Sequence, residues 1–188
     1  MSGNTDKYKK KIITIPNILS FVRLCLIPVI IWLYIGRGYY FLSGIVVLFS
    51  GLTDIVDGYI ARKFNMISDV GKVLDPIADK ATQLAVLILL TISFPLMIVP
   101  IAVTVLKETF MATSGYLVIK KCDIVLGAEW HGKLATVVLT ATMALHLFWH
   151  NINATLSCVT IILSAAVILF SLVMYVIRNF GYLFKKEN

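Results

Sequence analysis

Residues 54–62 read Asp-Ile-Val-Asp-Gly-Tyr-Ile-Ala-Arg, and residues 71–79 read Gly-Lys-Val-Leu-Asp-Pro-Ile-Ala-Asp. The two acids of the first run are three residues apart and those of the second are four apart, so each pair lies on one face of a helix. The neighbouring segments, residues 39–56 and 81–99, are apolar enough to lie in lipid, where an ionised carboxylate costs several kcal/mol. Such acids need cations beside them. The four acids are Asp54, Asp57, Asp75 and Asp79.

The short connection at residues 63–70 makes the two predicted helices antiparallel neighbours and turns the acid pairs toward each other. Carboxylate oxygens are hard ligands that suit Mg²⁺, Mn²⁺ or Ca²⁺, and Mg²⁺ usually shares its coordination shell with substrate phosphates. The sequence therefore predicts a site for one or two divalent metal ions. The alternative is that acids near helix ends are solvated caps, and for Asp69 in the connection we expect only that role.

With the spacing between them, the two runs match the signature Asp-x-x-Asp-Gly-x-x-Ala-Arg, eight residues, Gly-x-x-x-Asp-x-x-x-Asp. On this motif the chain resembles the CDP-alcohol phosphotransferases. The resemblance implies a six-helix integral membrane enzyme, usually a homodimer, that moves a phosphatidyl group from CDP-diacylglycerol to an alcohol and releases CMP. The matching positions are Asp54, Asp57, Gly58, Ala61, Arg62, Gly71, Asp75 and Asp79.

The resemblance also implies a role for each matching residue. The first three aspartates hold metal, and the fourth, Asp79, lies near the metals and is the expected general base. With Asp79 counted among the ligands, the four acids would hold Mg²⁺ or Mn²⁺ in a two-metal site. The expected CDP contacts within the motif are Gly58, Ala61, Arg62 and Gly71.

The composition predicts an all-α, polytopic membrane protein. Of the 188 residues, 59% are hydrophobic and 14% are charged, and the mean hydropathy of +0.90 is too high for a soluble domain. We expect one CDP-alcohol phosphotransferase membrane domain over residues 1–188, in which residues 1–15 form a basic cytoplasmic segment. Six segments could each span a bilayer, at about 20 residues per span: residues 15–35, 40–60, 73–93, 96–118, 132–149 and 154–177.

Basic residues gather on one side of the predicted bundle, and only Arg37 falls on the other side. By the positive-inside rule the basic side is cytoplasmic, so we expect both termini and the acidic hairpin to face the cytoplasm of a bacterial cell. Aromatic and basic residues are not interleaved in a way that favours nucleic acid. The basic side carries Lys7, Lys9, Lys10, Lys11, Arg62, Lys63, Lys72, Lys120, Lys121, Arg178, Lys185 and Lys186, the last three as an expected membrane anchor.

Three polar residues at helical spacing open the first predicted span: Asn17, Ser20 and Arg23. A lone arginine one or two turns inside a membrane can snorkel to the surface, but a face shared with Asn17 favours a pocket. Family members carry an asparagine, a serine or threonine and an arginine at this place. The resemblance therefore implies that Asn17 and Arg23 line the nucleotide and phosphate site.

Two lysines are candidates for binding the acceptor. Lys107 and Glu108 fall near the middle of the fourth span, so at least one of them should face the bundle interior. They could instead neutralise each other in a structural pair. Lys133 is the second candidate, and its alternative is an ordinary lysine at the membrane boundary. We expect no ligand role for the three histidines: His131 at the boundary, and His146 and His150 toward the outer face.

Within the family the chain looks most like the phosphatidylglycerophosphate synthases of phospholipid biosynthesis, which implies glycerol 3-phosphate as the acceptor. Two departures bear on that acceptor. Lys107 replaces an arginine of many synthases and Ala135 replaces a lysine. Because lysine lacks the bidentate geometry of arginine, a less anionic acceptor stays open: phosphatidylglycerol, as in a cardiolipin synthase of this family, or a glycolipid.

Two hypotheses from other classes remain. A membrane prenyltransferase also combines aspartate-rich helices with Mg²⁺, but its Asp-x-x-x-Asp motifs lack the Gly-x-x-Ala-Arg that follows Asp57. A cation transporter could use intramembrane acids, but it has no need of the nucleotide-binding glycines and arginine, and the chain shows no inverted repeat.

Overall fold

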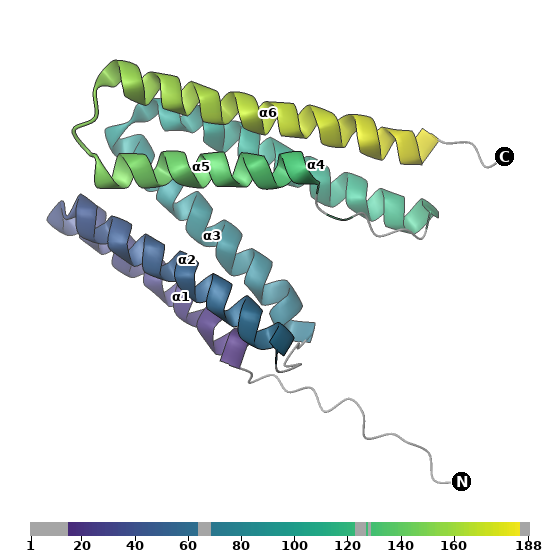
Figure 1. Cartoon of the computed structure of the whole chain (residues 1–188), viewed down its shortest axis with the longest axis horizontal. Coiled ribbons are helices and arrows are strands. Elements are labelled where there is room, and N and C mark those ends of the chain that lie inside the picture. Colours follow the sequence, from purple (N-terminus) through teal and green to yellow (C-terminus); the bar gives the residue numbers. More distant parts are fainter. Residues whose placement is uncertain (1–14, 64–68, 123–126, 128, 185–188) are drawn as a thin grey trace, which may run out of the picture. The chain divides into compact units, whose positions relative to one another are not determined.

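The computed structural model describes residues 15–63, 69–122, 127 and 129–184, and within them it contains helices and no strand, which confirms the all-α prediction (Figure 1). Side chains of residues 54–63 fall outside the described part. The elements are α1 (Ile15–Ile31), η1 (Trp32–Gly36), α2 (Tyr40–Lys63), α3 (Asp69–Ser93), η2 (Pro95–Met97), α4 (Ile98–Cys122), α5 (Trp130–Phe148) and α6 (Ala154–Phe184).

Backbone contacts divide the chain into two compact units, Met1–Val86 and Leu87–Asn188. The prediction of one membrane domain over the whole chain stays a prediction.

The first unit contains α1 and α2, which pack side by side (Figure 1). Between them the chain widens into the π-helical turn η1 and then reverses direction. Gly38 has a φ of 67°, a conformation that glycine adopts without steric cost, and it lies between the predicted spans 15–35 and 40–60. Beyond the turn, the ring of Tyr40 packs edge-on against that of Tyr34 with centroids 4.9 Å apart. The turn thus makes the first two helices antiparallel neighbours.

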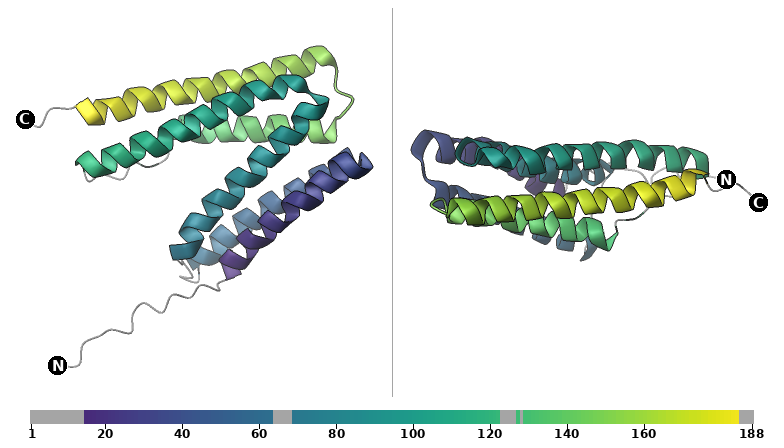
Figure 2. Two further views of the ribbon diagram at one scale, coloured as in Figure 1. Left: turned by 180° about the vertical axis from the view of Figure 1, so that it is seen from behind. Right: turned by 90° about the horizontal axis from the view of Figure 1, so that it is seen from above.

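The second unit is organised by α6, which packs against both α4 and α5 (Figure 2). Serines on its buried face, such as Ser164 and Ser171, are 0% exposed and allow close approach. Near its end Asn179, which is 1% exposed, donates a 2.7 Å hydrogen bond from Nδ2 to Ser114 Oγ of α4. The last helix thus joins α4 through a buried hydrogen bond as well as through apolar packing.

Four segments of the described chain are long and apolar enough to cross a membrane: Asn17–Gly36, Leu74–Ser93, Pro95–Lys121 and Ala154–Tyr182. The protein is therefore an integral membrane protein. The six predicted spans correspond to the six long helices of the described chain. However, α2 contributes only the shorter apolar segment Tyr40–Thr53, and α5 is not among the four segments. Both helices carry polar groups, which lowers their mean hydropathy. The count of six spans stays a prediction.

Helix ends differ from the predicted spans at three places. Asp69, expected in the connection, is the first residue of α3. At the start of α5, Trp130 and His131 already belong to the helix. The last helix runs to Phe184 instead of ending at residue 177, so Arg178 lies inside it. Hydropathy alone underestimates such helices because polar end residues keep the helical backbone after the apolar run stops.

Candidate active site

The polar face predicted for the first span is present on α1. Asn17, Ser20 and Arg23 are 6%, 0% and 2% exposed, whereas Phe21 between them is 62% exposed. A buried arginine requires polar or anionic surroundings, because an isolated charge is costly to remove from water. The shared face is thus confirmed, and snorkelling of Arg23 to the surface is not what the structure shows.

This face is joined to the acidic motif through Ser20. The Ser20 hydroxyl donates a hydrogen bond to Oδ1 of Asp75 on α3. Arg23 Nη2 donates in turn to Ser20 Oγ over 3.4 Å, so guanidinium, hydroxyl and carboxylate form one chain. All three residues belong to the first unit. The sequence predicted the shared face but gave no partner for Ser20.

The residues of the motif that lie on α3 differ in burial along the helix. Gly71 is buried, Asp75 is half-buried, and Ala78 is 0% exposed. Asp79, one turn beyond Asp75, is exposed. The two carboxylates therefore have different surroundings: Asp75 is held by the Ser20 hydroxyl, while Asp79 lies at a more open position.

The other half of the motif lies on α2, whose backbone is helical there. The side chains of Asp54, Asp57, Gly58, Ala61 and Arg62 lie outside the described residues. Among the described side chains no three histidines, cysteines or acids gather into a metal site. Asp75 fits a hard divalent cation, because carboxylate oxygens suit Mg²⁺ or Mn²⁺. The hydrogen bond from Ser20 to Oδ1 would orient this carboxylate as a ligand.

In the second unit, Lys107 is buried in α4 with 7% of its surface exposed. Its Nζ lies 3.1 Å from Glu108 Oε1, and the glutamate is the more exposed partner. The burial of Lys107 confirms that one of the two charges faces the interior. The short distance to Glu108 also agrees with the alternative that the two residues neutralise each other in a structural pair. One turn earlier, Thr104 is 8% exposed, and its hydroxyl has no hydrogen-bond partner within the described residues.

The other acceptor candidate, Lys133, is exposed on the first turn of α5. Its backbone N–H donates to the Glu129 carbonyl over 3.2 Å. Ala135, at the position where the synthases have a lysine, is 1% exposed. Packing therefore closes that position, and a second lysine side chain has no room there.

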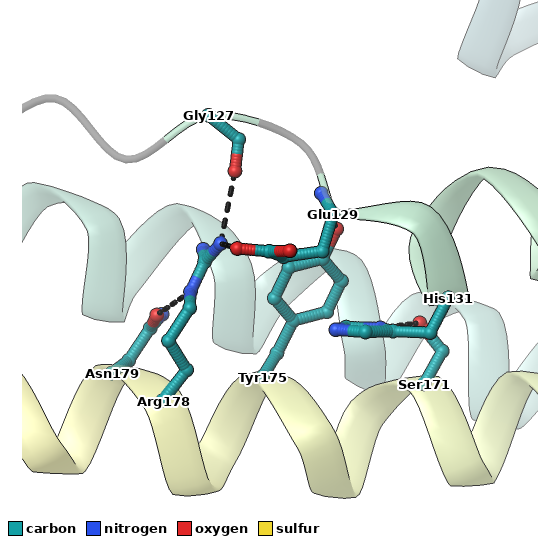
Figure 3. Close-up of polar contacts among 7 residues, drawn as sticks. All are labelled: Gly127, Glu129, His131, Ser171, Tyr175, Arg178 and Asn179. Atoms are coloured by element: carbon teal, nitrogen blue, oxygen red, sulfur yellow. Dashed lines mark hydrogen bonds and ion pairs between the residues drawn. The ribbon is translucent and has the colours of Figure 1, made fainter.

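A polar cluster between α6 and the start of α5 was not predicted from the sequence (Figure 3). Arg178, for which only a membrane anchor was expected, donates from Nη1 to Glu129 Oε1 at 2.8 Å. His131, expected at the membrane boundary, is 3% exposed, and its Nδ1 lies 3.1 Å from Ser171 Oγ. The available signal was the spacing of Ser171, Tyr175 and Arg178, which places them on one face of a helix.

Comparison with known proteins decides which family these features belong to. Residues 13–177 match the family model described as CDP-alcohol phosphatidyltransferase. The chain belongs to that family. The match includes the polar face of α1, both halves of the acidic motif and both acceptor candidates. Family membership identifies a phosphatidyltransferase, and it sets aside the membrane prenyltransferase and the cation transporter.

Relatives of this phosphatidyltransferase carry two kinds of name. A CDP-diacylglycerol–glycerol-3-phosphate 3-phosphatidyltransferase of Aquifex aeolicus is 31% identical over 179 residues, which cover 92% of this chain and 99% of the relative. The protein of the same name from Bacillus subtilis is 30% identical over 149 residues, 70% of this chain and 77% of the relative. A cardiolipin synthase (CMP-forming)/mitochondrial hydrolase fusion protein of Schizosaccharomyces pombe is 45% identical over 84 residues, 45% of this chain but 14% of that protein.

Proposed function

We propose that this protein transfers a phosphatidyl group from CDP-diacylglycerol to glycerol 3-phosphate, giving phosphatidylglycerophosphate and CMP. The observation that carries the proposal is the chain of contacts from Arg23 through Ser20 to Asp75, because it joins a buried cationic face to the acidic motif of the family. A cation and a carboxylate held one hydroxyl apart suit a substrate whose phosphates need both positive charge and metal. The name of the Aquifex relative, whose match spans 92% of this chain and 99% of the relative, supports the acceptor.

In the proposed reaction, a hydroxyl oxygen of the acceptor attacks the phosphorus that carries the diacylglycerol. The bond between that phosphorus and the bridging oxygen of CMP breaks, and CMP leaves with the electron pair. Asp79 takes the proton of the attacking hydroxyl, a role that suits its exposed position one turn beyond Asp75. Asn17, Arg23 and Arg62 bind the nucleotide and its phosphates, and Gly58, Ala61 and Gly71 leave room for its close approach.

Asp54, Asp57, Asp75 and Asp79 would hold two ions of Mg²⁺ or Mn²⁺. When bound, such ions neutralise phosphate charge and stabilise the charge that develops on the leaving group. Ser20 fixes the orientation of Asp75 by donating to Oδ1, which is the role of an outer hydrogen bond to a ligating carboxylate.

The proposed protein crosses the bilayer six times as a homodimer, with both termini and the acidic hairpin in the cytoplasm. The positive-inside distribution of lysine and arginine supports this orientation. An active site on that side gives both the lipid-bound nucleotide and a soluble phosphate ester access from one compartment.

Phosphatidylglycerol is the second candidate acceptor, which would make the protein a cardiolipin synthase. The name of the Schizosaccharomyces pombe fusion protein supports it. Two structural features favour a less anionic acceptor as well. Lys107 already pairs with Glu108, and the buried Ala135 excludes a further lysine. Lys133 instead favours glycerol 3-phosphate, because an exposed lysine can bind a phosphate.

The proposal is tested by incubating the purified protein with CDP-diacylglycerol and single acceptors: glycerol 3-phosphate, phosphatidylglycerol, a glycolipid, inositol 1-phosphate and serine. CMP release is measured, and the lipid product is identified by mass. We expect release with glycerol 3-phosphate and the mass of phosphatidylglycerophosphate. Turnover only with phosphatidylglycerol would replace the synthase assignment by the cardiolipin one, and no CMP release with any acceptor would contradict the phosphatidyl-transfer reaction itself.

Removing either acceptor lysine should raise the KM for glycerol 3-phosphate by roughly tenfold, because a hydrogen bond to a charged group contributes about 1.5–3 kcal/mol. We therefore expect this increase in Lys107→Ala and in Lys133→Ala, with the KM for CDP-diacylglycerol little changed. Lys120→Ala is the matched control, since Lys120 is exposed near the end of the same helix as Lys107. A normal KM for glycerol 3-phosphate in both variants would contradict the assignment of this acceptor site.

Ser20→Ala should raise the Mg²⁺ concentration needed for half-maximal activity by about tenfold, the lower end of the range for outer partners of metal ligands. The physical reason is that Asp75 loses the donor that orients it. Ser43→Ala is the control, because Ser43 is also 0% exposed but donates to the Tyr40 carbonyl of its own helix. Equal Mg²⁺ requirements in the two variants would remove the proposed role of Ser20.

A further inference from the structure

The start of α5 is fastened to α6 through the hydroxyl of Tyr175 (Figure 3). The backbone N–H of Glu129, just before the helix, donates to Tyr175 Oη over 3.2 Å. Tyr175 is 3% exposed, and its ring packs edge-on against the His131 ring with centroids 4.5 Å apart. The helix entry is therefore held by a specific donor and acceptor as well as by apolar packing.

Gly132 makes this contact sterically feasible. A side-chain carbon at residue 132 would collide with Tyr175 Oη and would lie 3.0 Å from Cζ. The tyrosine therefore occupies the space that any other residue at this position would need. This close approach fixes the distance between the first turn of α5 and the last third of α6.

Arg178 fastens the same segment one turn further along α6. Its Nη1 donates to Glu129 Oε1 over 2.8 Å and to the Gly127 carbonyl over 3.0 Å, and its guanidinium lies 4.9 Å from the centre of the Tyr175 ring. Glu129 is thereby held at both its backbone and its side chain. Its carbonyl accepts the first-turn hydrogen bond from the N–H of Lys133.

From these contacts we infer that Tyr175 is a positioning residue for Lys133. The hydroxyl holds Glu129, Glu129 closes the helical turn that contains Lys133, and the exposed ammonium of Lys133 is thereby set at one place for the acceptor phosphate. The inference rests on the proposed function, in which Lys133 contacts the acceptor. Tyr175 itself need not touch any substrate.

Tyr175→Phe tests the inference because it removes only the hydroxyl and keeps the buried ring. We expect the KM for glycerol 3-phosphate to rise by about fivefold, the effect of one hydrogen bond. The kcat, the KM for CDP-diacylglycerol and the melting temperature should stay near those of the unchanged protein. Tyr116→Phe, at a position that is 65% exposed on α4, is the control and should alter none of these values. An unchanged KM for glycerol 3-phosphate in Tyr175→Phe would overturn the inference.

A double-mutant cycle with Lys133→Ala separates positioning from general stability. If Tyr175 acts through Lys133, Tyr175→Phe should raise the KM for glycerol 3-phosphate in the wild-type protein. The same substitution should hardly change this KM in the Lys133→Ala variant. Equal factors in both backgrounds would overturn the positioning role and leave the acceptor role of Lys133 intact. A Lys133→Ala variant with normal KM would instead remove that acceptor role, and the inference with it.

Gly132→Ala gives an independent check of the contact. The variant should raise the KM for glycerol 3-phosphate, because the added methyl group displaces Tyr175. Combining it with Tyr175→Phe removes the colliding oxygen and should recover part of the loss relative to Gly132→Ala alone. If the KM for glycerol 3-phosphate in the double variant rises by the product of the two single factors, residues 132 and 175 are not sterically coupled. That result would overturn the inference.

Discussion

Asp79→Asn is expected to turn over at least about a hundredfold more slowly than the unchanged protein while binding CDP-diacylglycerol with nearly normal affinity. Loss of a general base typically costs about 10²- to 10⁴-fold in rate. Asparagine keeps the shape of the side chain but cannot take the proton of the attacking hydroxyl. The exposed position of Asp79 supports this role, since the acceptor must reach it. Single-turnover rates and equilibrium binding of CDP-diacylglycerol measure the two effects separately.

Asp57→Ala provides the contrast, because Asp57 is proposed as a metal ligand and not as a base. Both turnover and the response to added metal should be lost in this variant, and nucleotide binding should weaken with them. If Asp79→Asn loses nucleotide binding to the same extent as Asp57→Ala, Asp79 acts chiefly as a ligand, and the proton must go elsewhere.

Removal of divalent metal is expected to abolish activity. The four acids proposed as metal ligands would repel one another, and uncompensated charges are costly in a membrane protein, so the site needs a cation to hold substrate phosphates. Dialysis against a chelator followed by assay of CMP release should show no turnover, and added Mg²⁺ or Mn²⁺ should restore it. Full activity after exhaustive chelation would contradict the metal site. If the melting temperature falls on chelation and recovers when metal is added back, the metal also stabilises the fold.

Features that depend on residues close together in the sequence, the helices and their buried faces, were predicted well. The helices follow from apolar runs of membrane length, and the buried face of Asn17, Ser20 and Arg23 follows from helical spacing. The partner of Ser20 could not be predicted in this way, because Asp75 is 55 residues away and nothing local relates the two helices. Spacing shows which residues share a face but not which residues that face meets.

The cluster around Tyr175 was missed for the same reason. Its hydroxyl meets the backbone of Glu129, which is 46 residues earlier in the chain, and a backbone N–H has no sequence signature. The bulk of Tyr175 explains why residue 132 is a glycine, because a Cβ there would collide with the tyrosine hydroxyl. Burial of Ala135 likewise needed the packed helices, since the sequence showed a missing lysine but not the lack of room for one.

The pairing of histidines on α5 with serines on α6 bears on the proposed six-span topology. His131 meets Ser171 near one end of α5, and His146, which is 0% exposed, lies 2.9 Å through Nε2 from Ser157 Oγ near the other. Polar groups that face hydrocarbon alone are costly, but groups that satisfy each other within a helical hairpin are not. If α5 crosses the bilayer as in the proposed six-span topology, its histidines would therefore find their hydrogen-bond partners on α6 and would not face hydrocarbon alone.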